Sequence, residues 1–141
     1  MLGTCLVSFC EMKIFTLSSD KEIIRLVNSF ASEYKHQSII YNKSKIPIDI
    51  VGYAYEKNPF VIIIDDDYAT PNAAVVISTI KKMKENIKII FVTSDASVEL
   101  GKKISPLGIT YYAIKPLDKY EFDELLSSIS KNKLNTTYNQ L

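Results

Sequence analysis

A continuous apolar run in the middle of the chain restricts the fold more than any other feature of the sequence. Phe60–Ile64 are five apolar residues in a row, and three aspartates, Asp65 to Asp67, follow directly. No polar residue alternates with the apolar ones, so both faces of a strand formed here would be buried. Such a run is typical of a parallel sheet that is covered by helices on both sides.

Strand and helix patterns alternate along the rest of the chain. The predicted strands are Lys13–Leu17, Ser38–Tyr41, Phe60–Ile64, Ile87–Val92 and Ile109–Ile114. Each is followed by a segment whose apolar residues recur at helical spacing, as in Ile23–Ala31 and Phe122–Ile129. Five such units in series imply right-handed crossovers and a doubly wound α/β fold with five parallel strands.

Polar residues mark where several of the helices are expected to begin. Ser19 precedes Glu22 at the spacing of a capping box, and Asp118 is a further candidate cap for the last helix. Thr70 precedes Pro71, a pair that predicts an N-cap followed by proline in the first helical turn.

The composition excludes several classes of function. Seventeen lysines and arginines stand against sixteen acidic residues, so the basic surface of a nucleic-acid-binding protein is not expected. The four glycines are too scattered for a P-loop or a dinucleotide-binding loop. Two cysteines and a single histidine, His36, cannot supply a zinc site or a histidine-based catalytic triad.

The two ends of the chain differ from the middle. Residues 1–11 are mildly apolar, but they lack the basic start of a signal peptide and are too short to cross a bilayer. We therefore expect a cytoplasmic protein without a membrane-inserted segment. Met12 is an alternative start, which would make residues 1–11 a non-native extension. Residues 12–130 are then the domain, and 131–141 a polar, frayed tail.

In a doubly wound sheet, ligands bind beyond the carboxyl ends of the strands. The polar residues at these predicted strand ends are Ser18, Ser19, Asp65 to Asp67, Thr93, Ser94 and Lys115. Because parallel strands all end at the same edge, we expect these side chains to converge on one site.

Four features at these strand ends occur in a characteristic order. Asp65 ends the third strand, Thr93 the fourth, and Lys115 the fifth, where a proline follows the lysine. Tyr112 precedes Lys115 by three residues, and the separation between Thr93 and Lys115 is 22 residues. In these features the sequence resembles a response regulator receiver domain, the phosphoacceptor part of two-component signalling, from about residue 12 to residue 129.

The resemblance implies a flavodoxin-like sheet with the strand order 2-1-3-4-5. It also implies that Asp65 is the phosphoacceptor, that Thr93 and Lys115 bind phosphoryl oxygens, and that Tyr112 is a rotamer switch. Mg²⁺ would be held by the carboxylate of Asp65 and by the backbone carbonyl of Asp67.

The metal-binding part of the pattern is altered. Receivers normally carry two adjacent acidic residues after the first strand, where this chain has Ser18 and Ser19. Removing one carboxylate about 4 Å from the ion removes roughly 4 kcal/mol of Coulomb attraction at an effective dielectric constant near 20. We therefore expect weak or absent Mg²⁺ binding and slow or absent phosphorylation. Asp20, Asp66 or Asp67 would restore a carboxylate by turning inward; otherwise Asp66 and Asp67 belong to a solvated loop.

The leading hypothesis is a stand-alone receiver-like domain of a two-component phosphorelay, which is not an enzyme. Its expected partners are a sensor histidine kinase or another signalling protein. A homodimer would form through the fourth helix, the fifth strand and the fifth helix, near Tyr111 and Tyr112.

Two alternatives remain open. In the first, the chain is a pseudo-receiver that binds a partner without phosphorylation, and Lys115 with Asp65 is a structural ion pair. In the second, it is a small flavodoxin-like enzyme that binds a cofactor. Against that second alternative, no glycine-rich or serine-rich phosphate loop follows the first strand.

Overall fold

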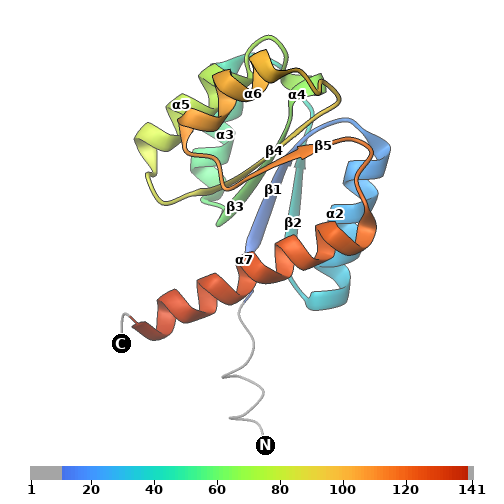
Figure 1. The fold of residues 1–141 in the computed structure, drawn as a ribbon. Helices are drawn as coiled ribbons and strands as arrows, with labels where there is room; N and C mark the ends of the chain where they lie inside the picture. The colour runs from blue at the N-terminus through green and yellow to red at the C-terminus, as the bar shows by residue number, and fades with distance from the viewer. Residues whose placement is uncertain (1–10, 140–141) are drawn as a thin grey trace, which may run out of the picture.

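The computed structural model describes residues 11–139, with side chains described as far as residue 133. Five parallel strands form one sheet in the order β2-β1-β3-β4-β5 (Figure 1). The strands are β1 (Lys13–Leu17), β2 (Gln37–Tyr41), β3 (Val61–Asp65), β4 (Lys88–Thr93) and β5 (Tyr111–Ile114). The predicted α/β fold and strand order are therefore confirmed.

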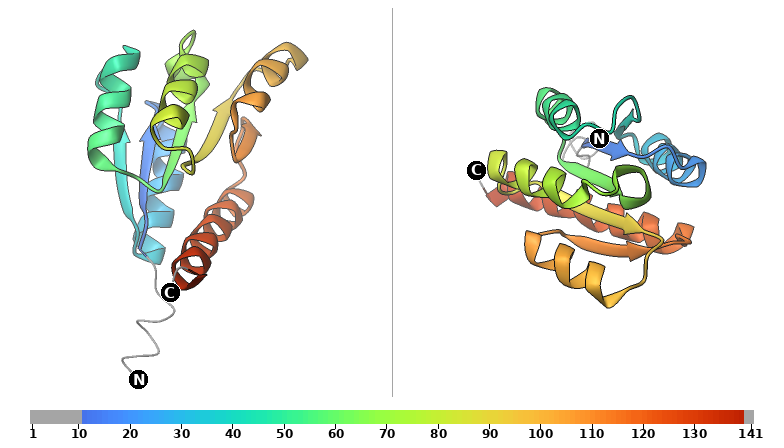
Figure 2. Two further views of the ribbon diagram at one scale, coloured as in Figure 1. Left: turned by 90° about the vertical axis from the view of Figure 1, so that its left-hand side faces the viewer. Right: turned by 90° about the horizontal axis from the view of Figure 1, so that it is seen from above.

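Helices cover both faces of this sheet (Figure 2). On one face lie α2 (Lys21–Tyr34) and α7 (Lys119–Asn139). On the other face lie α3 (Pro47–Lys57), α5 (Ala73–Met83) and α6 (Val98–Ile104). The remaining helical segments are the single-turn α4 (Asp66–Ala69) and the 3-10 turn η1 (Ser105–Leu107).

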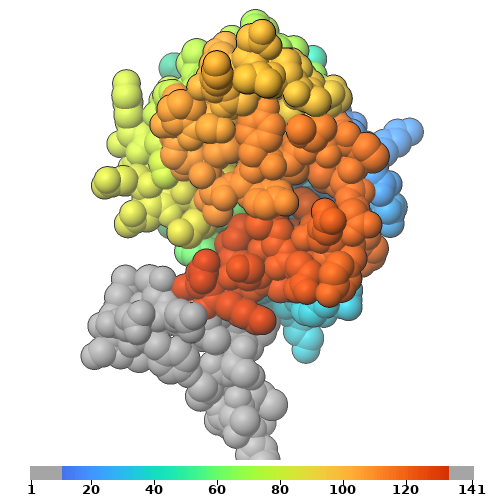
Figure 3. Space-filling view, in the orientation of Figure 1, coloured from blue at the N-terminus to red at the C-terminus, as the bar shows by residue number. Residues whose placement is uncertain are grey.

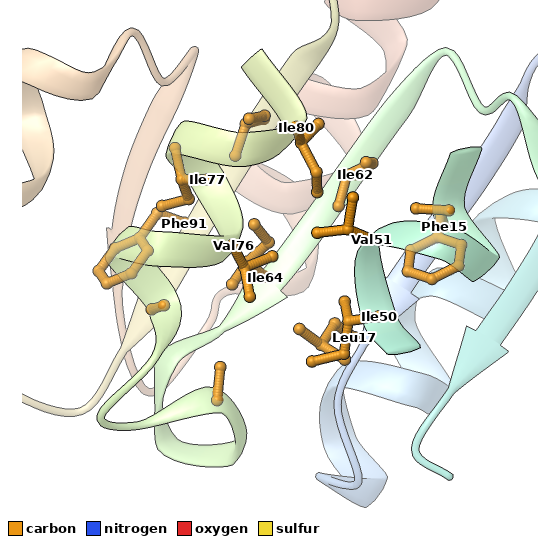
Figure 4. Packing of buried hydrophobic residues seen from close by; sticks show 14 of the residues in the cluster. Phe15, Leu17, Ile50, Val51, Ile62, Ile64, Val76, Ile77, Ile80 and Phe91 are labelled. Atoms are coloured by element: carbon orange, nitrogen blue, oxygen red, sulfur yellow. The ribbon is translucent and has the colours of Figure 1, made fainter. Parts of the chain in front are cut away.

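The central strand β3 explains why the apolar run has no polar residue in it. All five of its residues are buried. Ile62 and Ile64 pack against α3 and α5, as Figure 4 shows, whereas Ile63 packs with α2 and α7 on the opposite face. Successive strand residues point to opposite faces, so only an unbroken apolar run can fill both layers. The carboxyl end of β3 is therefore held rigidly between two packed layers.

Helix α2 begins one residue later than the capping-box pattern predicts. Asp20 is its N-cap, and the Asp20 carboxylate accepts hydrogen bonds from the backbone N–H groups of Glu22 and Ile23. Ser19 is exposed and does not fill that role. An aspartate at this position also brings a negative charge to the positive end of the helix dipole.

The helix predicted to begin at Thr70 and Pro71 also begins later. The backbone after β3 first forms α4, and Thr70 ends that short helix as its C-cap. Helix α5 then starts at Ala73, with Asn72 as its N-cap residue. Asp66 and Asp67 therefore belong to a helical turn, and the expectation of a loop is wrong, although Asp67 is exposed to solvent.

The C-terminal helix is longer than predicted, but its start agrees with the sequence pattern. The Asp118 carboxylate accepts a hydrogen bond of 2.9 Å from the backbone N–H of Glu121. Helix α7 then continues through residues 131–139, where a frayed tail was expected. No glycine or proline occurs after Pro116, so no residue in this segment interrupts the helical backbone.

Residues 1–10 of the expected N-terminal extension and residues 140–141 of the expected tail lie outside the described part of the chain. Within residues 11–139, no helix is both long enough and apolar enough to cross a membrane.

Candidate functional site

The site is built at the carboxyl edge of the sheet, starting from two buried residues on neighbouring strands. Strands β1 and β3 pair in parallel with Leu17 opposite Ile64, which places the next residues, Ser18 and Asp65, side by side. The Ser18 hydroxyl donates a hydrogen bond of 2.7 Å to Oδ2 of Asp65. Asp65 is only 2% exposed, and Ser18 is fully buried. This bond satisfies a carboxylate oxygen that water cannot easily reach.

Lys115 connects the far side of the sheet to this carboxylate. It follows β5, and its Nζ atom lies 3.1 Å from Oδ1 of Asp65. The same nitrogen lies 2.9 Å from Oδ2 of Asp20 and 2.9 Å from Oδ2 of Asp67. The structure thus brings Asp65 and Lys115 together as the sequence predicts, and it adds two further carboxylates to the same ammonium group.

Thr93 lies near this group but bonds to a different aspartate. Its hydroxyl donates a hydrogen bond of 3.1 Å to Oδ2 of Asp66 and accepts one of 3.0 Å from the backbone N–H of Asp95. The neighbouring Ser94 hydroxyl donates to Oδ1 of Asp67 at 2.8 Å. Both hydroxyls of the β4 end therefore hold residues of α4 in place.

Tyr112 points toward the interior of the molecule. Its ring lies 5.1 Å from that of Phe91, the residue opposite it on β4. Within the described residues, its buried hydroxyl has no hydrogen-bond partner. Burial without a partner disfavours this hydroxyl, so an outward rotamer of Tyr112 would regain hydration at the cost of the contact with Phe91.

The positive charge of Lys115 and the negative charges of the aspartates around it stabilise one another. Burial alone would lower the pKa of the Lys115 ammonium, but the hydrogen bonds from it to Asp20, Asp67 and Asp65 raise that pKa above its ordinary value. The hydrogen bond from Lys115 lowers the pKa of Asp20. Burial acts to raise the pKa of Asp67, but its bonds from Lys115 and Ser94 outweigh burial and lower it. Lys115 is therefore charged throughout the physiological range.

Asp66 differs from the other aspartates of the site. Burial raises its pKa, and the nearby charges of Asp67 and Asp65 act in the same direction, partly opposed by the bond from Thr93. Within the described part of the chain, Asp66 bonds to Thr93 and not to the Lys115 ammonium, so its charge is the least compensated of the group.

A small open pocket of about 220 Å³ gives access to the site. Lys45 and Tyr68 line it, together with Ser19, Asp20, Asp65, Asp67 and Lys115. Lys45 is not among the site residues predicted from the sequence, although it follows β2 and its position beyond a strand end could have identified it. A larger pocket of about 410 Å³ lies at the opposite edge of the sheet between α3 and α5, and apolar side chains form most of its lining.

The donor set does not fit the Mg²⁺ site that the resemblance implies. Ser18 offers a neutral hydroxyl, which already donates to Asp65. Asp20 does turn inward, but its Oδ2 atom contacts the Lys115 ammonium, and Asp66 turns to Thr93 instead. Among the described residues, no three Cys, His, Asp or Glu side chains are placed to hold a metal ion together.

The fold is shared with a large set of solved structures. No protein-family model matches the chain. The signal receiver domain of a putative Luxo repressor protein from Vibrio parahaemolyticus is similar at a TM-score of 0.75 and 15% identity, covering 92% of this chain and 98% of that one. The chemotaxis protein CheY4 of Vibrio cholerae gives 0.69 and 14%, covering 85% and 99%.

A third solved structure has a similar fold. The CheY-like receiver domain protein of Methanospirillum hungatei has a TM-score of 0.68 and 18% identity, with 94% of this chain and all of that chain covered (100%). The chain therefore has the fold of response regulator receiver domains, and the resemblance predicted from the strand-end residues is confirmed at the level of the fold.

Proposed function

We propose that this chain is a receiver-like signalling domain of a two-component phosphorelay, and that Asp65 is its phosphoacceptor. The observation that carries the proposal is the 3.1 Å contact between Lys115 Nζ and Oδ1 of Asp65. These two residues are far apart in the sequence, and the parallel sheet brings them to one edge. The receiver-type fold supports a role in the same signalling class.

The chemistry of phosphoryl transfer to Asp65 follows from these contacts. An oxygen of the Asp65 carboxylate attacks the phosphorus of a phosphoryl donor, a new O–P bond forms, and the bond to the leaving group breaks. Positioning and electrostatic stabilisation carry most of the catalysis in such a transfer. Lys115 offsets the negative charge of the incoming group, and Lys45 adds positive charge at the mouth of the pocket. The Thr93 hydroxyl exchanges its bond with Asp66 for one with a phosphoryl oxygen.

The proposed output surface is the face formed by α6, β5 and the start of α7 (Figure 3). Tyr111 and Ile114 are each nearly half exposed on the edge strand β5. They also line a pocket of about 190 Å³ with Phe122 and Leu125 of α7. A strand edge with exposed apolar groups suits a protein partner, either a sensor histidine kinase, another signalling protein or a second copy of the chain.

Phosphorylation-independent binding is the second candidate function, and one observation favours it. Asp65 is almost fully buried, and its two oxygens already accept hydrogen bonds from Ser18 and from the backbone N–H of Asp67. In that case the Asp65 and Lys115 pair is structural and fixes one conformation of the output surface. We do not propose the cofactor-binding enzyme, because no contact among the described residues favours it. A cytoplasmic location and the absence of nucleic-acid binding stay predictions.

The test is the intact mass of the chain after incubation with acetyl phosphate. The expected result is a single phosphoryl adduct that is absent from Asp65→Asn. The matched control is Asp123→Asn on α7, whose carboxylate contacts Lys119 far from this site and which should keep the adduct. An adduct that persists in Asp65→Asn contradicts the assignment of the phosphoacceptor. If neither the natural chain nor any variant gives an adduct, the phosphorylation-independent function is the one that remains.

A further inference from the structure

We infer that the apolar pocket between α3 and α5 binds a small amphipathic carboxylate of the fatty-acid class, and that the ligand carboxylate pairs with Lys84. This pocket lies at the amino edge of the sheet, opposite the site of Asp65 and Lys115. The inference goes beyond the proposed function and does not depend on it, because no residue of the Asp65 site takes part.

The pocket has the size and the walls of a small-molecule site. Its volume is about 410 Å³, within the range of about 300–1,000 Å³ that is usual for such sites. Core side chains from three elements form its inner wall: Val51 of α3, Ile62 of β3 and Ile80 of α5, which Figure 4 shows close together. All three belong to the packed layer on this face of the sheet, so the pocket is preformed. An apolar body can enter it without a rearrangement of the core.

Two large side chains extend this apolar surface to the mouth of the pocket. Tyr55 of α3 is 69% exposed and Met83 of α5 is 47% exposed, and both line the pocket. An apolar chain lying between them would cover surface that otherwise faces water, which is favourable. The pocket therefore favours an apolar body over a polar one.

A positive charge stands at the polar end of the pocket. Lys84 lines it, and its Nζ atom donates hydrogen bonds of 2.7 Å to Oδ1 of Asn58 and 3.2 Å to the backbone carbonyl of Pro59. Both acceptors are neutral, and a lysine ammonium has three N–H donors. Across residues 11–133, no carboxylate forms an ion pair with Lys84. Within this part of the chain, one donor and an uncompensated positive charge are therefore available to a ligand.

The surroundings of Lys84 favour an anion beside it. Partial burial lowers the pKa of the Lys84 ammonium, and the positive charge of Lys133 acts in the same direction. A ligand carboxylate next to this ammonium would offset both effects. A charged group that the fold desolvates but does not pair is a common feature of binding sites.

Positive charge continues beyond Lys84 into a second pocket. This pocket of about 310 Å³ adjoins the first, since Asn58 and Lys84 line both, and its lining also includes Lys13 and Lys133. Glu11 is the acidic residue in that lining. The apolar pocket and the basic pocket therefore meet at Lys84, which sets the direction of a ligand. Its apolar body faces the inner wall, and its anionic group faces the lysines.

The helix ends at this edge do not reverse the preference for an anion. Both α3 and α5 end here, and the carbonyl groups of a helix C-terminus repel negative charge. Lys57 in the last turn of α3, and Lys81 and Lys82 in the last turn of α5, offset this effect with full positive charges. The acidic Glu56 and Glu85 of the same edge are exposed, where solvent screens them.

Isothermal titration of the full chain with sodium octanoate tests the inference. The natural chain should bind octanoate saturably, and Lys84→Gln should bind it at least about tenfold more weakly, because a charge-assisted hydrogen bond is lost. The matched control is Lys82→Gln, since Lys82 is exposed on the same helix and does not line the pocket. It should bind as the natural chain does. No saturable binding by the natural chain, or an unchanged affinity in Lys84→Gln, would overturn the inference.

Two analogues separate the apolar part of the ligand from its charge. Octanol has the same chain without the charge and should bind more weakly than octanoate. Octylammonium carries the opposite charge and should not compete with octanoate. Equal binding of octanol and octanoate would contradict the role of Lys84, because the pocket would then take up apolar chains without recognising an anion.

A second pair of variants tests the apolar mouth. Tyr55→Ser should weaken octanoate binding, whereas Tyr120→Ser on α7 should not, although Tyr120 is similarly exposed at 72%. Because both side chains are exposed, both variants should fold. Sedimentation velocity without ligand tests a different occupant of the pocket, a second copy of the chain. A dimer that Tyr55→Ser dissociates, together with no octanoate binding by the natural chain, would overturn the inference.

Discussion

Ser18 and Ser19 are chemically identical neighbours with different surroundings. Ser18 is buried and bonds to the carboxylate of Asp65, whereas Ser19 is exposed. Both stand where the sequence resemblance leads one to expect acidic residues, so only the structure separates their roles. At the scale of single residues, the property that matters is which hydroxyl faces the buried charge.

Replacing Ser18 by alanine should lower the free energy of unfolding by about 1–3 kcal/mol, because a buried carboxylate oxygen loses its partner. The measurement is urea unfolding, with Ser19→Ala as the control. The control should change stability by less than about 0.5 kcal/mol, as is usual for an exposed position. Equal effects of the two substitutions would contradict the bond between Ser18 and Asp65.

The meeting of Asp65 and Lys115 could be predicted from the sequence, because both residues directly follow apolar strand runs. The bonds of Asp66 and Asp67 could not. They depend on α4, a single turn too short to leave a periodic pattern in the sequence. That turn directs Asp66 to Thr93 and Asp67 to Lys115. Strand-end position identifies which residues gather, but local backbone geometry decides which of them bond.

At the scale of elements, the N-terminus of α2 is tied to the site by one residue. Asp20 caps this helix through Glu22 and Ile23 and also binds Lys115. A capping-box pattern centred on Ser19 could not reveal this, since sequence spacing does not show that Ser18 is buried and turns the chain by accepting the N–H of Asp20. The apolar pattern also could not show how far α7 extends. The helix continues beyond residue 130 because no glycine or proline interrupts it, not because apolar residues recur at helical spacing there.

The pH dependence of stability should follow from the aspartates at these helix starts. The pKa values of Asp20 and Asp67 are lowered in the folded state. Their stabilising contribution is therefore complete above the ordinary aspartate pKa of about 4 and is lost as the pH falls through the lower folded values. The raised pKa of Asp66 has the opposite sign, because its contribution increases as the pH falls through its folded pKa.

Protonation of Asp20 and Asp67 removes their ion pairs with Lys115, so we expect a loss of stability below about pH 4. The loss should be smaller in Asp20→Asn, which keeps a side-chain oxygen for the cap but has no charge to titrate. Urea unfolding of both forms across a series of pH values measures this difference. Parallel stability curves for the two forms would contradict the coupling of Asp20 to Lys115.

At the scale of the whole molecule, the parallel sheet explains why the site exists. Strands β3 and β5 are separated in the sheet only by β4, and their carboxyl ends point in the same direction (Figure 1). The apolar layers on both faces fix β3 in place, so Asp65 cannot withdraw from the edge. The fold class and the strand order could therefore be predicted from periodicity and resemblance, and with them the approximate position of the site.

A double-mutant cycle between Asp65 and Lys115 tests the central claim that these two side chains meet and interact. The free energy of unfolding is measured for the natural chain, Asp65→Asn, Lys115→Gln and the double variant. The structure predicts a coupling energy of about 0.5–3 kcal/mol, the range for residues in direct contact. The pair Asp65→Asn and Lys119→Gln should be additive. Additive effects of Asp65→Asn and Lys115→Gln would contradict the account, because two groups in contact at this buried edge cannot be energetically independent.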